Sequence, residues 1–403
     1  MLLRQPLWKV VRLALVAAAA IGPLAAPRDA RAADEELKRR QATIKGLVVR
    51  KLDGGKRAGA AIGIVATAGQ RFPGGQVAIR GTIGPSMESA LKEAERYVRV
   101  EHPDLGNVDI QVSFEERYAP KDGGSAGTAF AVLLRSLTDG YAVDPNVSMT
   151  GDIAVNGTVQ PIGGVTAKLR GSRQDGGMIV VIPKANVPAV ADLLVGPDKV
   201  EVLADLQVFS VETVDQAVAV ARVDRGEKVA TAIKTYADAQ AAMKARKAAA
   251  LSDPAVQRML RTVLDLAPNH VSAKYALDIA TGKGPRTLTR NASLIEVFAV
   301  SEPFAAAMNS GEKLTREALP TTTVRQVQRD LQATRRLVHP DVEPLRLAVS
   351  DWIDAIDRVL SANRPISKED AAVIARRRDA LRAALKRLES DEALVEKMMR
   401  EGY

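Results

Sequence analysis

The apolar residues in the first half of the chain follow two different periods. Short stretches of alternating or β-branched residues, bounded by glycines, predict strands. The predicted strands cover 43–49, 60–67, 76–80, 108–114, 147–150 and 178–182. A period near 3.6 residues predicts amphipathic helices over 85–98 and 125–137, the second ending at Gly140. Residues 43–222 are therefore expected to form an α+β domain.

Beyond residue 222, strand patterns give way to long helical periods with few glycines. Helices are expected over 232–250, 254–266, 270–280, 345–360 and after Ser367, which fits a helix cap. The last two carry apolar stripes and predict an antiparallel hairpin. Residues 223–403 are therefore expected to form an all-α accessory domain. The joint at 266–270 also resembles that of a tetratricopeptide helix pair, although no repeat of about 34 residues supports it.

The first 32 residues have the pattern of an export signal. A positively charged start is followed by an apolar stretch over 13–26 and by a small-x-small cleavage site at Ala30-Arg31-Ala32. The stretch is shorter than the roughly 20 residues of a membrane span, which favours a cleaved signal over a retained anchor. Residues 33–42 then form a charged linker. The mature protein is expected to be periplasmic or extracellular, without stable membrane insertion.

The amino-acid composition excludes several kinds of functional site and binding partner. The absence of Cys excludes disulfides, thiolate metal sites and Cys nucleophiles, and three His residues argue against a His-rich metal site. The formal net charge of +9 arises from basic and acidic residues mixed along the chain, without a basic run interleaved with aromatics. No metal, cofactor or nucleic-acid partner is therefore expected.

A glycine-rich loop precedes the helix over 125–137. In Lys121-Asp122-Gly123-Gly124-Ser125, the Ser falls at the helix N-terminus. Free N–H groups and the positive end of the helix dipole can stabilise an oxyanion there. The same position also suits a Ser that only caps the helix. The loop alone leaves both interpretations open.

A second pattern places a lysine within an apolar helix face. If a helix begins near Gly164, Lys168 shares one face with Val165, Leu169 and Ser172. Desolvation lowers the pKa of a buried lysine, and a neutral amine can take the proton of a Ser hydroxyl as a general base. A Lys168 that instead extends its amine to the surface along its methylene stem fits the same pattern.

These two patterns belong to a longer, ordered series of motifs. The series is Gly81-Thr82-Ile83-Gly84, Pro120-Lys121-Asp122-Gly123-Gly124-Ser125-Ala126-Gly127, Met149-Thr150-Gly151-Asp152, Val159-Gln160-Pro161-Ile162-Gly163-Gly164, Lys168 and Ile182-Pro183-Lys184-Ala185-Asn186-Val187. Over about 76–222 the chain resembles the proteolytic domain of Lon proteases. The resemblance implies an α+β serine endopeptidase with Ser125 as nucleophile and Lys168 as general base.

The resemblance also implies supporting residues and partners. Thr150 is expected to lie beside the dyad and to position the Lys168 amine by hydrogen bonding, although Thr is also an ordinary strand residue. Asp122 is expected to shape the loop before the nucleophile. Asp152 replaces the family's usual Glu with a shorter carboxylate of the same charge. Lon domains commonly form rings, so a homo-oligomer that acts on polypeptides is expected.

The chain departs from the family in three further places. Gly124 stands where a Pro usually precedes the nucleophile, so the loop is expected to be less rigid. Gln111 and Ser113 occupy a strand that often carries His. No Gly-x-x-x-x-Gly-Lys-Ser/Thr phosphate loop occurs in the sequence. The combination predicts an ATP-independent peptidase, without a bound nucleotide, that acts on unfolded or flexible polypeptides.

Two other functions fit the same sequence. A Lon-like fold can serve assembly or peptide binding without catalysis. Alternatively, the helical half is the functional part, a docking scaffold with the protease domain as its processing device. Retention of both dyad residues favours the peptidase.

Overall fold

The computed structural model describes residues 41–51, 57–71, 74–116, 121–305, 320–362, 364–391 and 394. The predicted export signal at 1–32 and most of the linker at 33–42 lie outside the described residues. Gln41 and Ala42, assigned to that linker, instead begin the first strand. No helix within the described ranges is long and apolar enough to cross a membrane.

One mixed sheet of seven strands organises the first half of the described chain. In spatial order the strands are β3 (Val77–Arg80), β4 (Val108–Phe114), β2 (Arg57–Arg71), β1 (Gln41–Lys51), β5 (Val147–Met149), β8 (Ile179–Pro183) and β9 (Gln207–Val211). β1 and β2 form a long antiparallel hairpin. On the other side of β1, the strands β5, β8 and β9 run parallel. Every residue of β8 and β9 is buried, as expected of parallel strands covered on both faces.

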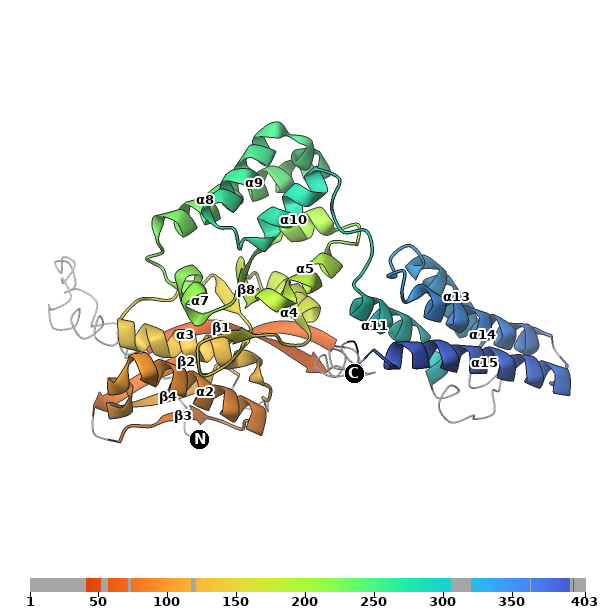
Figure 1. Cartoon of the computed structure of the whole chain (residues 1–403), viewed down its shortest axis with the longest axis horizontal. Coiled ribbons are helices and arrows are strands. Elements are labelled where there is room, and N and C mark those ends of the chain that lie inside the picture. Colours follow the sequence, from red (N-terminus) through yellow and green to blue (C-terminus); the bar gives the residue numbers. More distant parts are fainter. Residues whose placement is uncertain are drawn as a thin grey trace, which may run out of the picture.

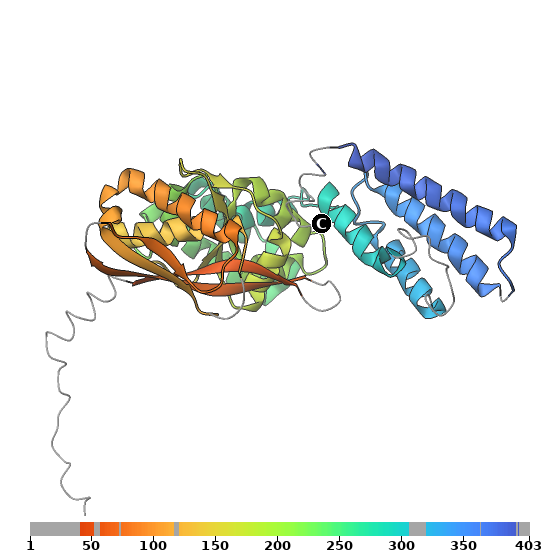
Figure 2. The same ribbon diagram turned by 90° about the horizontal axis from the view of Figure 1, so that it is seen from below.

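Two helices cover the half of the sheet that is formed by β1 to β4, in which only the β3–β4 pair is parallel. The first, α2 (Pro85–Glu101), buries the face that its sequence predicts: Met87, Ala90, Leu91, Ala94 and Val98. The second, α3 (Gly127–Asp139), follows a 3-10 turn at Gly124–Ala126 and ends at Gly140 in the left-handed conformation. Because α3 is apolar on nearly all sides, it is buried along most of its length. Figure 2 shows α2 and α3 on one side of the strands.

Short helices alternate with the strands of the parallel half. They are α4 (Val165–Gln174), α5 (Val187–Leu193), α6 (Lys199–Asp205) and α7 (Val214–Ala221). A small hairpin of β6 (Asp152–Ile153) and β7 (Val159–Gln160) stands outside the main sheet. The α+β class is therefore confirmed, although β9 and this small hairpin were not predicted from the sequence.

The first helices beyond residue 222 pack onto the α+β domain. They are α8 (Glu227–Arg246), α9 (Pro254–Leu266) and α10 (Val271–Ala280). His270 lies between Phe209 of β9 and Tyr236 of α8, with ring centroids 4.4 Å apart in both pairs. The Tyr236 hydroxyl donates to the Leu203 carbonyl at 3.0 Å. Hydrophobic packing thus crosses the boundary drawn at 222, and one apolar core extends from Ala42 to Ala276.

A second apolar core begins at Leu294. It joins α11 (Arg290–Ser301), α13 (Thr321–Thr334), α14 (Glu343–Ser361) and α15 (Lys368–Glu389). It contains Trp352, which is fully buried and whose ring centroid lies 5.9 Å from that of Phe304. α14 and α15 form the predicted hairpin, and Ser367 caps α15 in a capping box with Asp370. The all-α class of this region is confirmed, and Figure 1 shows it beside the larger body.

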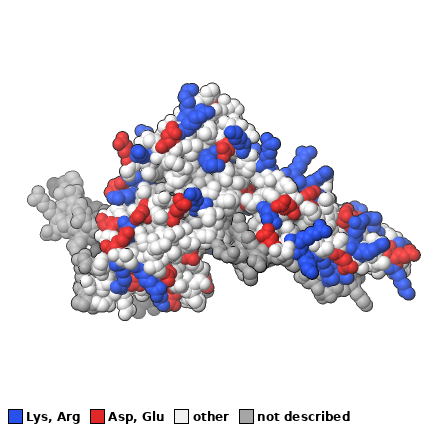
Figure 3. All heavy atoms as spheres, viewed as in Figure 1, with Lys and Arg blue, Asp and Glu red and all other residues white. Residues whose placement is uncertain are grey.

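Charges of both signs are interspersed over the surface. Figure 3 shows Lys and Arg side chains next to Asp and Glu side chains across the face in view. On α2, for example, Lys92 pairs with Glu88 and Arg99 pairs with Glu95. This mixed, solvated surface is the pattern that the sequence predicts.

Candidate active site

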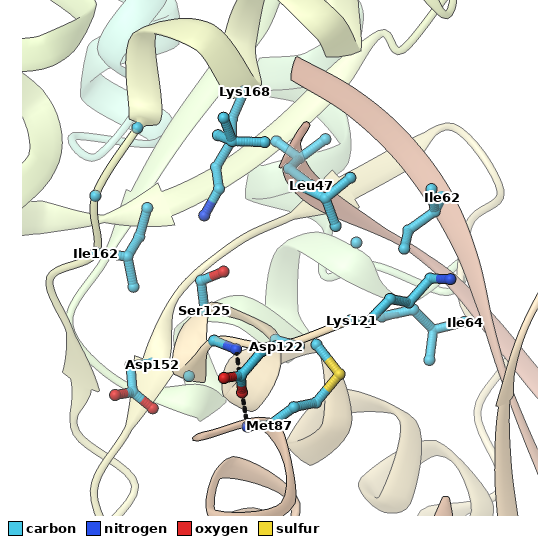
Figure 4. A pocket seen from close by; sticks show the side chains of 18 of the residues that line it. Leu47, Ile62, Ile64, Met87, Lys121, Asp122, Ser125, Asp152, Ile162 and Lys168 are labelled. Carbon is cyan, nitrogen blue, oxygen red and sulfur yellow. Dashed lines mark hydrogen bonds between the residues drawn. The ribbon is translucent and has the colours of Figure 1, made fainter. Parts of the chain in front are cut away.

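Ser125 and Lys168 line the same cavity, which has a volume of about 580 Å³. Its walls come from β1, from the loop before α3, and from the loop at 161–164 that leads into α4. Figure 4 shows Lys168 extending its amine from one wall toward Ser125 on another. The fold therefore brings the two sequence motifs to one site.

The backbone around Ser125 is fixed from two directions. Gly123, two residues before it, has φ +112°, a conformation that residues with a side chain rarely adopt. The Ser125 carbonyl accepts hydrogen bonds from the Gly151 N–H at 2.9 Å and from the Thr150 hydroxyl at 3.2 Å. With its carbonyl held in this way, Ser125 stands in the 3-10 turn that leads directly into α3. The positive end of the α3 dipole is therefore next to the hydroxyl.

Asp122 joins the nucleophile loop to α2. Its carboxylate accepts hydrogen bonds from the Gly123 N–H at 2.8 Å and from the Met87 N–H at 3.1 Å. The Met87 donor belongs to the first turn of α2, whose own N-cap residue, Gly84, supplies no side-chain bond. These bonds, led by that from Gly123, hold the pKa of Asp122 below its ordinary value. Asp122 thus lies where the sequence predicted a loop-shaping residue.

Lys168 is buried rather than extended to the surface. The side chain projects from α4 with 4% of its surface exposed, alongside buried Val165, Leu169 and Ser172. Its Nζ donates to the Thr150 hydroxyl oxygen at 3.1 Å. Since that hydroxyl in turn donates to the Ser125 carbonyl, one fully buried threonine connects Lys168 with Ser125. The structure therefore contains the hydrogen bond expected for Thr150.

Direct backbone contact sets the position of α4. Gly59 of β2 faces Gly171 and Ala167 of α4 so closely that a methyl group on Gly59 would lie 1.9 Å from the Ala167 carbonyl oxygen. A methyl group on Gly171 would lie 2.1 Å from the Gly59 carbonyl carbon. At the end of the helix, the Asp175 carboxylate accepts a hydrogen bond from the Ala61 N–H at 2.7 Å. Two glycines and one side chain thus place the helix that carries Lys168.

Asp152 and Gly124 meet at the floor of the cavity. The Asp152 carboxylate packs against the Gly124 backbone, where a methyl group on Gly124 would lie 2.8 Å from Oδ2. Burial raises the pKa of Asp152 above its ordinary value. The Gly that replaces the family's Pro therefore makes room for this carboxylate.

The apolar part of the cavity was not predicted from the sequence. It consists of Leu47, Ile62, Ile64, Met87 and Phe114, all buried. Lys121 lies at the same part, with its Nζ 5.2 Å from the centroid of the Phe114 ring, and desolvation lowers its pKa. The alternation within β1 and β2 indicates that one face is buried, but not that this face continues into an active site.

The other polar side chains considered from the sequence either make structural contacts elsewhere or lie outside the cavity. His270 is fully buried, caps α10 through its Nδ1, and has a pKa lowered to about 3 by desolvation. His102 pairs with Asp139 at 2.9 Å. Gln111 and Ser113 lie on β4, outside the residues that line the cavity. Within the described part of the chain, no group of His and carboxylate side chains is arranged to hold a metal ion.

A serine at a helix start and a buried lysine amine thus line one cavity. The model of the Lon protease (S16) C-terminal proteolytic domain matches residues 28–224. Residues 28–224 therefore belong to the Lon proteolytic-domain family.

Curated Lon proteases match part of the chain. The archaeal Lon protease of Thermococcus kodakarensis is 32% identical over 155 residues, which cover 38% of this chain and 24% of that protein. The Lon protease of Vibrio parahaemolyticus is 37% identical over 160 residues, covering 38% and 20%. That of Azospirillum brasilense is 37% identical over 152 residues, covering 36% and 18%. The chain thus matches less than a quarter of the length of these relatives.

Proposed function

We propose that this protein is an ATP-independent serine endopeptidase that hydrolyses peptide bonds in unfolded or flexible polypeptides. The observation that carries the proposal is the buried Lys168 amine, held by Thr150 in the cavity that contains Ser125. A lysine amine that shares a cavity with a serine hydroxyl can act as the general base for that serine. Membership of residues 28–224 in the Lon proteolytic-domain family supports the same function.

The chemistry follows from these positions. The Lys168 amine takes the proton of the Ser125 hydroxyl as Oγ attacks the substrate carbonyl carbon. The positive end of α3 stabilises the negative charge that develops on the carbonyl oxygen. Collapse of the tetrahedral species breaks the C–N bond, and the amine product leaves with the proton from Lys168. Water then hydrolyses the Ser125 ester, with Lys168 again as the base.

An open strand edge supports an extended peptide as the substrate. β1 pairs with β5 only at Lys45 and Gly46. Beyond Gly46, this edge of β1 has no strand partner among the described residues, and residues 46–50 line the cavity. A peptide that adds to this edge would satisfy its N–H and C=O groups and pass beside Ser125. Such pairing requires an unfolded or flexible segment, so folded proteins are expected to be poor substrates.

Independence from ATP and export from the cytoplasm are further parts of the proposal. They are supported by the absence of a phosphate-loop motif from the sequence and by the signal-like pattern at 1–32. The two features agree, because ATP does not drive reactions outside the cytoplasm.

The direct test is cleavage of an unfolded, labelled protein by the chain that starts at Ala33. Cleavage should proceed equally with and without ATP, and it should disappear in both Ser125→Ala and Lys168→Ala. Cleavage that requires ATP would refute the independence. Cleavage that survives both substitutions would place the active site elsewhere.

A further inference from the structure

We propose that Asp152 forms a subsite for a basic side chain of the substrate. The enzyme would then prefer bonds that have Lys or Arg on the Asp152 side of the scissile bond. The inference rests on the proposed peptidase function and adds a substrate class to it.

The position of Asp152 separates it from the apolar part of the cavity. Figure 4 shows Asp152 and Ile162 on one side of Ser125, and Leu47, Ile62 and Ile64 on the other. All of these residues line the cavity. A peptide that crosses Ser125 therefore places the residues on either side of the scissile bond in two different environments.

In the absence of substrate, few interactions stabilise the negative charge of the Asp152 carboxylate. Within the described residues it accepts one hydrogen bond, from the Ile153 N–H to Oδ1 at 2.8 Å. The charged neighbour that acts on it is Glu93 of α2, a second carboxylate. A half-buried carboxylate beside another acid is stabilised by an incoming cation. An ammonium or guanidinium group of the substrate has that charge, and it can donate hydrogen bonds to the carboxylate oxygens.

Gly124 brings this carboxylate close to the reacting atoms. Because Gly124 has no side chain, Asp152 packs against the backbone of the residue directly before Ser125. A substrate residue that flanks the scissile bond can therefore place its basic side chain against Asp152, next to the nucleophile.

The other part of the cavity has more basic than acidic side chains. Lys121 lies there over the Phe114 ring, and Arg50, which pairs with Glu116, also lines the cavity. A basic substrate residue at that position would meet a like charge and would have to leave water for an apolar surface. The cavity thus accepts an apolar residue at the Lys121 part and a basic residue at the Asp152 part, and this polarity orients the peptide.

The test uses internally quenched peptides with one Leu-Leu bond. Lys, Gln or Glu is placed at each of the two positions on either side of that bond. On the side of the bond that binds near Asp152, Lys should raise kcat/KM about tenfold over Gln, the size of one charge-assisted hydrogen bond. On the side that binds near Lys121, Lys should lower kcat/KM. In Asp152→Asn the Lys-to-Gln ratio should fall to about one, whereas Asp152→Glu should retain it.

A Lys-to-Gln ratio that is the same in the wild type and in Asp152→Asn would overturn the inference and leave the peptidase function intact. No cleavage of any peptide, or cleavage that persists in Ser125→Ala, would overturn both. Circular dichroism of each variant establishes that it is folded. Because Asp152→Glu keeps the charge, a ratio lost in both variants would also contradict the inference.

Discussion

Thr150 hydrogen-bonds to both residues of the proposed dyad, Lys168 and Ser125. It accepts a hydrogen bond from the Lys168 amine and donates one to the Ser125 carbonyl. Removing the hydroxyl leaves the buried amine without this acceptor and loosens its position. Thr150→Val, which keeps the shape, should lower kcat/KM for a peptide substrate by about tenfold to a hundredfold. Thr150→Ser keeps the hydroxyl and should retain most activity, so equal losses in the two variants would contradict this role.

Asp152 and Asp122 should affect stability with opposite dependence on pH. A carboxyl whose folded pKa is raised, as for Asp152, binds its proton more tightly in the folded state, so it costs stability as pH rises above about 4. Asp152→Asn should therefore melt about 1–2 °C above the wild type at pH 7, with the difference vanishing toward pH 3.5. A difference that is independent of pH would contradict the assignment.

Asp122 provides the matched comparison. Hydrogen bonds depress its pKa in the folded state, so its contribution to stability is present above its unfolded pKa of about 4 and is lost as pH falls through the folded value. Asp122→Asn should melt below the wild type at pH 7, and the gap should close as the pH is lowered. Thermal unfolding of both variants across the same pH range tests the two signs together.

The sequence predicted the dyad because both residues stand in a recognisable series of motifs. The Gly-rich loop alone left Ser125 open as a simple helix cap, and the helical stripe alone left Lys168 open as a surface side chain; the ordered series of motifs that resembles Lon decided between these interpretations. The contact between Gly124 and Asp152 could not be predicted in the same way, since it depends on how the β6 strand turns back against the loop. Spacing along a helix is local, whereas this contact is set by tertiary packing.

At the scale of elements, the placement of α4 on β2 decides where Lys168 points. Gly59→Ala and Gly171→Ala each insert a methyl group where no space exists, and this forces the helix away from the strand. Each should reduce stability by about 1–3 kcal/mol and lower kcat more than it raises KM. Gly226→Ala is the control, because Gly226 faces open space at negative φ. Activity equal to wild type in Gly59→Ala would show that α4 is not positioned by this contact.

The elements that the sequence predicted well are those with a long, one-sided pattern. α2 and α14 bury the predicted stripes, and the bounds of β4 and α9 agree with the prediction. β9 was missed because it has five residues, all buried, and begins with the polar Gln207. Gln207 is buried because its side chain hydrogen-bonds to Gln240 and His270, partners that only the folded chain brings near.

At the scale of the whole molecule, the structure predicts where the chain can be shortened. A chain that ends at residue 222 loses Tyr236 and His270, which cover Phe209 of β9. It should therefore be far less stable than a chain that ends at residue 284, which keeps the first core complete. Comparing the thermal unfolding and peptide cleavage of the two shortened chains tests this. Equal stability would mean that α8–α10 are dispensable for the protease domain.

The helical unit after residue 284 meets the protease domain at Asp192. This α5 carboxylate accepts hydrogen bonds from the Thr289 N–H at 2.7 Å and from its hydroxyl at 2.9 Å, at the start of α11. The contact fixes where the unit begins but does not assign it a role. The homo-oligomer expected from family resemblance stays a prediction, and light scattering of the chain with and without residues 285–403 tests whether this unit contributes to assembly.

The measurement that tests the central claim most directly is covalent labelling by a serine-directed phosphonate, followed by mass spectrometry. The account predicts one adduct per chain, on the peptide that contains Ser125, and none in Ser125→Ala. In Lys168→Ala the rate of labelling should fall at least about a hundredfold, because the hydroxyl has lost its base. Labelling of Ser125 at the same rate with and without Lys168, or no labelling of Ser125 in the folded wild type, would contradict the Ser–Lys dyad.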